Sequence, residues 1–150
     1  MAAPGTNVHG TVIRIGATGL IFVGPSGAGK SMLAFLTLTA ALRRGHDAAL
    51  VADDQVFVEQ RDGRILARRP DATAGLIEIR GTGIATLPSV PSAVLTQAIR
   101  PVDLATSDRL PPENERHALL PGLDLPLLRI DRHCPDPLAV IAAFLPLQPG

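Results

Sequence analysis

The feature that most constrains how this chain can fold is a glycine-rich octapeptide set between an apolar run and a helix-forming run. The octapeptide GPSGAGKS occupies positions 24–31, after the apolar run at 19–23 and before the helix-forming run at 32–44. It fits the pattern G-x-x-x-x-G-K-[ST] at every position. Its three glycines allow backbone conformations that a Cβ would forbid, so successive N–H groups can point into one concavity. The succession of strand, phosphate-binding loop (P-loop) and helix predicts an α/β fold.

Each residue type of the octapeptide suits a nucleoside triphosphate. The unpaired N–H groups at the start of the helix and the positive end of its dipole attract phosphate. We expect Lys30 to reach the β- and γ-phosphates and the Ser31 hydroxyl to ligate Mg²⁺. ATP and Mg²⁺ are therefore the expected cofactors. The residues predicted to bind the nucleotide are Gly24, Pro25, Ser26, Gly27, Ala28, Gly29, Lys30 and Ser31.

Length and composition set the class of protein. A chain of 150 residues suits one domain with one core. Fourteen basic and fourteen acidic side chains leave no net charge, which argues against nucleic acid as the main partner. The single cysteine, Cys134, cannot form an internal disulfide, and no apolar run approaches the roughly 20 residues that span a bilayer. We expect a single cytoplasmic domain, residues 1–150, that binds neither nucleic acid nor membrane.

Apolar alternation and turn signals predict further elements along the chain. A strand at 8–15 is expected to form a hairpin with the strand before the P-loop. A strand starting at Ala93 contains Pro101, which should limit it to an edge or an irregular end. The run at 75–84 predicts a short strand that places Glu78 and Arg80 on one face before a Gly-x-Gly turn, and the alternative to a functional role is a salt bridge between these two residues. The other expectations are a buried strand at 48–52, a hairpin at 55–67 around Asp62-Gly63, a polar loop at 107–115, a strand at 125–130 and a helix at 137–145.

Two carboxylates, Asp53 and Asp54, directly follow the buried run at 48–52. Because ligands of nucleotide-binding α/β proteins lie at the carboxyl edge of the sheet, we expect this pair to face the phosphates and Mg²⁺. The alternative is a pair of acids on a surface turn, which the preceding buried strand disfavours. His9 lies in the first expected strand, where spacing alone indicates an ordinary half-buried histidine.

Four blocks of the chain together resemble the C-terminal catalytic domain of bacterial HPr kinase/phosphorylase. In family order they are Val8-His9-Gly10, the P-loop, the run from Gly45-His46 to Asp53-Asp54, and the run IEIRGTGI at 77–84. The last block is the specific one, because P-loops are widespread. The resemblance covers most of the chain. It implies a P-loop domain with a strongly curved mixed sheet, similar to the fold of phosphoenolpyruvate carboxykinase, which suits the predicted hairpins better than an all-parallel sheet.

The resemblance also implies roles for single residues in phosphoryl transfer. Asp54 matches the residue that accepts the proton of the target serine and returns it in the reverse, phosphorolytic direction, and His9 acts beside it. Lys30 matches the catalytic lysine. Arg109, in Asp-Arg-Leu, matches a catalytic arginine.

The implied reaction is ATP-dependent phosphorylation of a serine of the phosphocarrier protein HPr. The resemblance also implies that the chain can assemble into a homo-oligomer. Ser31 and Glu78 match the magnesium ligands of the family, and Asp53 is expected to support the metal through water. Three features depart from the family pattern, one of them being that the segment at 87–91 is shorter than the corresponding loop of the longer enzymes. The chain begins almost at His9, so we expect the family's N-terminal domain to be absent. Residues 132–137 lack the basic, glycine-containing motif linked to dephosphorylation, so the reverse activity stays open.

Two functions of other kinds stay open beside HPr phosphorylation. A small-metabolite kinase would need a substrate pocket closed by a lid, and the chain has no arginine-rich lid segment. A non-catalytic nucleotide sensor would bind ATP and transfer nothing. One assay with ATP, Mg²⁺ and purified HPr separates the three.

Overall fold

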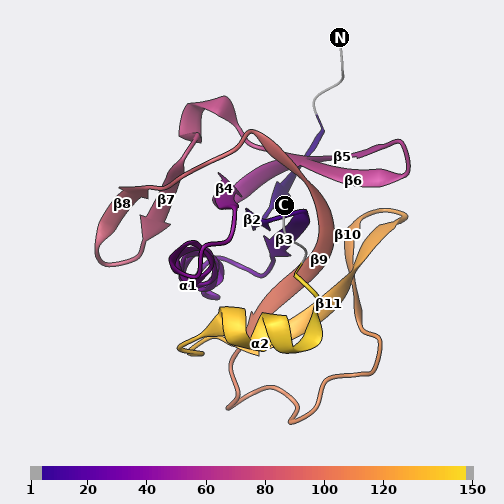
Figure 1. Cartoon of the computed structure of the whole chain (residues 1–150). Coiled ribbons are helices and arrows are strands. Elements are labelled where there is room, and N and C mark those ends of the chain that lie inside the picture. The colour runs from indigo at the N-terminus through magenta and orange to yellow at the C-terminus, as the bar shows by residue number, and fades with distance from the viewer. Residues whose placement is uncertain (1–4, 148–150) are drawn as a thin grey trace.

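The chain is built around a strongly curled, mixed β-sheet that carries two helices (Figure 1). The computed structural model describes residues 5–147. Its strands are β1 (Thr6–His9), β2 (Thr11–Ile15), β3 (Thr18–Phe22), β4 (Ala48–Ala52), β5 (Gln55–Arg61), β6 (Arg64–Arg68), β7 (Leu76–Ile79), β8 (Gly83–Thr86), β9 (Ser92–Val102), β10 (Arg116–Leu120) and β11 (Leu123–Asp131). The helices are α1 (Lys30–Arg43), α2 (Pro137–Phe144) and the short 3-10 helix η1 (Asp71–Thr73).

The long strand β9 lies at the centre of the main sheet. The order of strands across this sheet is β1-β5-β6-β9-β3-β2-β4, and β11 pairs with β9 and with β10. β9 is parallel to β3 and β11 and antiparallel to β6, so the sheet is mixed. β7 and β8 form a separate two-stranded hairpin beside α1 (Figure 1).

The expectation that Pro101 confines its strand to an edge or an irregular end is wrong for the strand as a whole, because β9 is central, although Pro101 lies one residue before its end. β9 continues to Val102, and Pro101 lies opposite Ile130 of β11. Successive residues of a strand direct their polar groups to opposite sides. The carbonyl of Ile99 accepts from Val23 on the β3 side, whereas that of Val102 accepts from Arg132 on the β11 side. The missing N–H of Pro101 therefore faces the β3 side, beyond the last β3 pairing at Ile99, where no sheet partner is lost.

The expected strand at 8–15 is divided in two at Gly10. β1 pairs with β5, whereas β2 pairs with β3 and β4, so the two halves lie in different parts of the sheet. Gly10 is buried at the division, and a Cβ there would stand 2.9 Å from the side chain of Ile21. The hairpins β2–β3 and β5–β6, the buried strand β4 and the helices α1 and α2 lie where the sequence predicts them. β10 was not expected.

Side chains on the two faces of the sheet enter two separate apolar clusters. Ile13 and Leu20 point to the face covered by α1 and α2, whereas Val12 and Ile21 point into the hollow of the curled sheet. This alternation follows from the two-residue period of a strand. Among the fourteen residues of α1 only Met32 and Arg43 are exposed, which confirms that the helix is covered on most sides. No helix within residues 5–147 is long and apolar enough to cross a membrane.

Candidate functional site

The glycine-rich loop connects β3 to α1 and has the backbone that its sequence demands. Gly24, Gly27 and Gly29 have φ angles of 137°, 83° and 102°, in the region that side chains disfavour. The N–H of Val23 donates to Ile99 of β9 at 2.8 Å, so the start of the loop is fixed to the central strand. The loop thus stands at the end of the sheet, and Gly29 caps the start of α1.

Lys30 begins α1, and its side chain folds back under the loop. The ammonium donates to the carbonyls of Gly24 and Pro25 at 2.8 and 3.2 Å, and only 5% of Lys30 is exposed. The same nitrogen lies 4.0 Å from a carboxylate oxygen of Asp54. Lys30 therefore holds the loop closed and faces the site at the same time. It is the only lysine in the chain.

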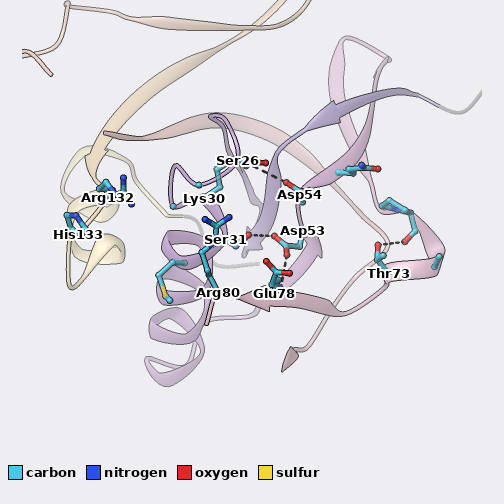
Figure 2. Close-up of a pocket in the computed structure, with 16 residues that line it drawn as sticks. Ser26, Lys30, Ser31, Asp53, Asp54, Thr73, Glu78, Arg80, Arg132 and His133 are labelled. Atoms are coloured by element: carbon cyan, nitrogen blue, oxygen red, sulfur yellow. Dashed lines mark hydrogen bonds and ion pairs between the residues drawn. The ribbon is translucent and has the colours of Figure 1, made fainter. Parts of the chain in front are cut away.

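The Asp53 carboxylate accepts hydrogen bonds from three different elements. Its Oδ1 accepts from Ser31 Oγ of α1 at 2.5 Å and from Thr11 Oγ1 of β2 at 2.9 Å. Its Oδ2 accepts from the Glu78 N–H of β7 at 3.0 Å. Two of these contacts are drawn in Figure 2, where Asp53 lies between the Ser31 and Glu78 side chains. The structure thus brings together three residues that the sequence assigns to the metal.

Asp54 follows in a left-handed backbone conformation with a φ of 69°, which is uncommon for a residue with a side chain. Its Oδ1 lies 2.8 Å from His9 Nε2, and the two side chains are 53% and 49% exposed. His9 is therefore no isolated strand histidine, because it contacts the predicted base directly. The backbone of Asp54 is held on both sides, by Gly10 N at its carbonyl and by Thr11 Oγ1 at its N–H.

These residues line a cleft of about 790 Å³ (Figure 2). Its walls come from the loop, the β4–β5 connection, the segment around η1, β7 and the β11–α2 connection. The predicted site residues in its lining are Ser26, Gly27, Gly29, Lys30, Ser31, Asp53, Asp54 and Glu78. His9 contacts this set through Asp54, and Gly24 and Pro25 contact it through Lys30.

Three basic residues of the lining were missed as site residues by the sequence analysis: Arg80, Arg132 and His133. Arg80 follows β7, and a Cβ on Gly27 would stand 3.5 Å from its guanidinium. Arg132 follows β11, and a Cβ on Gly29 would stand 3.7 Å from its Cβ. The two arginines thus approach the loop at different glycines. Within residues 5–147 neither forms an ion pair, so the alternative of a Glu78–Arg80 salt bridge is not seen.

Arg109 is the predicted site residue that the structure does not bring to the cleft. It lies in the exposed segment 103–115 between β9 and β10, and it is not part of the cleft lining. The catalytic role that the resemblance assigns to Arg109 stays a prediction.

The side-chain oxygen atoms of Ser31, Asp53 and Glu78 are the groups of the cleft that could hold Mg²⁺. Hard oxygen ligands suit Mg²⁺, which is usually held by one or two carboxylates, water and phosphate and needs no all-protein cage. The described part of the chain contains no group of three or more acidic, histidine or cysteine residues that could hold a metal. The short Ser31–Asp53 contact turns the Ser31 proton away, so that its lone pairs can face a cation.

A second charged cluster lies at the base of the segment 103–115. Glu115 receives two hydrogen bonds of 2.7 Å from Arg129, and Arg100 contacts His117 at 3.2 Å. The hydrogen bond from Arg129 lowers the pKa of Glu115, and the pKa of Arg129 is raised in turn. Burial, and to a lesser extent the charge of Arg100, lowers the pKa of His117. This cluster joins the end of the segment to the sheet.

Comparison with known proteins yields matches in sequence and in structure. Residues 1–104 match the family described as HPr Serine kinase C-terminal domain. The chain is 35% identical over 138 residues to an HPr kinase/phosphorylase of Clostridium beijerinckii, with 85% of this chain and 43% of that protein covered. It is 38% identical over 88 residues to a protein of the same name from Clostridium tetani, with 59% and 27% covered.

Among solved structures, the Hpr(Ser) kinase/phosphatase from Coxiella burnetii matches with a TM-score of 0.73 at 23% identity, covering 91% of this chain and 87% of that one. This match confirms the expected fold at the level of an α/β protein with a curled mixed sheet. The chain spans less than half the length of the two curated relatives.

Proposed function

The chain belongs to the HPr serine kinase C-terminal domain family, and on that basis we propose that it is an ATP-dependent kinase that phosphorylates a serine of the phosphocarrier protein HPr. We propose further that residues 1–150 form a single P-loop kinase domain of the phosphoenolpyruvate carboxykinase-like kind. With ATP as the phosphoryl donor, the location that we propose for the reaction is the cytoplasm.

One observation carries the proposal: a phosphate-type loop and the half-exposed carboxylate of Asp54 meet in one cleft. Phosphoryl transfer depends mainly on positioning and on charge stabilisation. The loop and Lys30 supply a cradle and a cation, and Asp54 supplies a carboxylate 4.0 Å from that cation. These are the parts that the reaction requires.

In the proposed reaction a serine Oγ attacks the γ-phosphorus, its proton passes to Asp54, and the bond to the β,γ-bridging oxygen breaks to release ADP. A positioned carboxylate base typically contributes about 10²–10⁴-fold to such a step. His9 orients the Asp54 carboxylate through their 2.8 Å contact. Ser31 and Glu78, with Asp53 behind them, would hold Mg²⁺, which neutralises phosphate charge when bound.

Arg80 and Arg132 are proposed to contact the phosphates, because they flank the loop and have no acidic partner within the described residues. Their guanidinium groups suit phosphate oxygens in geometry as well as charge. Together with Lys30 they place three cations around one loop.

The exposure of Asp54 and His9 favours a protein acceptor over a small metabolite. Asp54 and His9 are each about half exposed, so a serine on the surface of another protein can reach them. A metabolite kinase would enclose its acceptor to exclude water. HPr therefore fits the site better than a small acceptor does.

The test is an assay of the purified chain with ATP, Mg²⁺ and HPr, in which phosphoserine on HPr is measured by mass spectrometry. We expect ATP-dependent phosphoserine, and a loss of at least about 10²-fold for Lys30→Ala, as for other single groups that stabilise developing charge. Because Lys30 is the only lysine, an amine-reactive ATP analogue should label this position and little else. Labelling without transfer would favour a nucleotide sensor, and transfer to a small acceptor a metabolite kinase. Phosphorolysis of phospho-seryl-HPr is measured in the same assay with inorganic phosphate.

A further inference from the structure

A fully buried hydroxyl lies directly behind the two acids and has no part in the function proposed so far. Thr11, in β2, is 0% exposed, and its Oγ1 contacts both acids. It donates to Asp53 Oδ1 at 2.9 Å and accepts from the Asp54 N–H at 3.2 Å. We infer that Thr11 is a positioning residue, whose hydroxyl fixes both carboxylates of the proposed transfer site.

The direction of both hydrogen bonds follows from the groups involved. A backbone N–H can only donate, so Thr11 must accept from Asp54 with a lone pair. Its single proton is then free for Asp53, which accepts it as a carboxylate. The Ser31 hydroxyl likewise has only one proton and directs it to the same Asp53 oxygen at 2.5 Å. Thr11 and Ser31 are thereby coupled through one carboxylate oxygen.

Thr11 acts on Asp54 through the backbone. Asp54 adopts a φ of 69°, which a residue with a side chain keeps only when its surroundings hold it there. Three contacts hold it: Gly10 N at its carbonyl, Thr11 at its N–H and His9 at its side chain. His9 and Asp54 are half exposed, whereas Thr11 is fully buried. Of the two side chains that hold Asp54, Thr11 is therefore the one that solvent cannot replace.

Thr11 acts on Ser31 through Asp53. The Asp53 carboxylate has donors on three sides, namely Thr11, Ser31 and the Glu78 N–H. Such a carboxylate is held in one orientation, and it dictates where the Ser31 proton points. Loss of the Thr11 donor leaves Asp53 with fewer constraints and lets Ser31 rotate.

This inference rests on the proposed function for its effect on rate, but its structural part can be tested alone. The variant is Thr11→Val, which keeps the shape of the buried side chain and removes the hydroxyl. Thr11→Ser keeps the hydroxyl and removes a methyl group. The matched control is Thr37→Val in α1, because Thr37 is also 0% exposed and its hydroxyl donates to the carbonyl of Leu33, outside the site.

The first measurement is amide hydrogen exchange by NMR, which a 15.7 kDa chain permits. We expect Thr11→Val to accelerate hydrogen exchange of the Asp54 amide by about fivefold or more. This factor corresponds to the net free energy of one hydrogen bond, which the variant loses. Thr11→Ser and Thr37→Val should leave that amide as in the wild type. This readout needs neither ATP nor HPr, so it stands even if the chain does not phosphorylate HPr.

The second measurement separates kcat from KM. We expect Thr11→Val to lower kcat for HPr phosphorylation by about 10²-fold, because the reacting groups are no longer held in position. The KM for ATP should change less than about threefold. Thr11→Ser should recover most of the activity. Thr11→Ala, which also lacks the hydroxyl, carries the same expectation should the valine variant fail to fold. Unchanged Asp54 exchange in a hydroxyl-free variant overturns the inference, and so does faster exchange with a normal kcat.

Discussion

Asp53 and Asp54 are neighbours in sequence but lie in different surroundings. Asp53 accepts three hydrogen bonds from the protein, whereas Asp54 is 53% exposed and contacts only His9 closely through its side chain. The two residues form the connection between β4 and β5, and the backbone turns at Asp54, whose φ is 69°, so the two side chains enter different surroundings. A carboxylate that is fully engaged suits orientation of other groups, and one that faces solvent suits proton transfer to an incoming serine.

We therefore expect Asp54→Asn to lower kcat for HPr phosphorylation by at least about 10²-fold, with little change in ATP affinity. An amide keeps the size of the side chain but cannot accept the serine proton. Asp53→Asn should instead alter the Mg²⁺ dependence of the rate. Initial rates for both variants across ATP and Mg²⁺ concentrations check this. Near-normal turnover of Asp54→Asn, or the reverse pattern, would show that the base has been assigned to the wrong acid.

The second prediction concerns Glu78, whose side chain lines the cleft beside Asp53. Glu78→Gln should weaken nucleotide binding in the presence of Mg²⁺ by about 10- to 100-fold, a loss typical of disturbed metal sites. Binding without Mg²⁺ should change little, because the shape of the side chain is kept. Isothermal titration calorimetry with and without Mg²⁺ measures both affinities.

Asp124→Asn is the control for loss of one negative charge, since Asp124 pairs with Arg116 on the β10–β11 hairpin, outside the cleft. Equal losses of affinity with and without Mg²⁺ in the Glu78 variant would identify Glu78 as a structural residue of β7.

At the scale of elements, two connections between secondary-structure elements each carry an arginine that could act at the site. The β11–α2 connection carries Arg132 into the cleft, whereas the β9–β10 segment carries Arg109 outside it. We expect Arg132→Ala to weaken ATP binding by about tenfold or more, the loss of a charge-assisted hydrogen bond. Arg109→Ala should leave ATP affinity unchanged and lower kcat, if the segment reaches the site only during turnover. Calorimetry and steady-state rates for both variants decide the matter, and equal losses of ATP affinity would contradict this division.

Elements with strong local signals could be predicted from the sequence. The Asp62-Gly63 turn has φ angles of 54° and 75° and joins β5 to β6 as expected. The glycine-rich loop and the acids after β4 were likewise predictable, because their chemistry is concentrated in consecutive residues. Their meeting in one cleft followed from the rule that ligands lie at the carboxyl edge of such a sheet.

Features that depend on distant partners could not be predicted. Whether Pro101 is tolerated depends on where β3 ends, which no residue near Pro101 encodes. β10 is a short strand, and within residues 5–147 it pairs only with β11. Arg132 reaches the loop because β11 lies parallel to β9, so its approach to Gly29 has no local signal.

At the scale of the whole molecule, two apolar clusters lie on opposite faces of one sheet, and the same strands contribute side chains to both. We expect the chain to unfold in one cooperative step, as single domains of this size usually do. The chain has no Trp or Tyr, so far-ultraviolet circular dichroism and calorimetry are the suitable probes. Transition midpoints that differ between the two methods would indicate that the clusters unfold separately.

The charged cluster around Glu115 predicts how stability depends on pH. Glu115 has a lowered pKa in the fold, so its ion pair stabilises the protein above the ordinary pKa of 4.5 and is lost as the pH falls through the lower folded value. His117 also has a lowered pKa, so below its ordinary value of 6.5 the unfolded chain binds a proton that the folded chain does not. Both groups make the unfolded state bind more protons in acid. The free energy of unfolding should therefore decrease from pH 7 downward, first through His117 and then through Glu115.

Urea unfolding at pH 7, 6, 5 and 4 tests this with two variants. His117→Asn keeps an acceptor for Arg100 but cannot take up the proton, so the decrease in the free energy of unfolding between pH 7 and pH 5 should be smaller than in the wild type. Glu115→Gln should cost about 1–2 kcal/mol at pH 7, with the difference from the wild type shrinking as the pH falls below 4.5. His46→Asn, in the α1–β4 connection, controls for replacing a histidine. A His117 variant with the same pH dependence as the wild type would mean that His117 takes up its proton equally in the folded and unfolded chain.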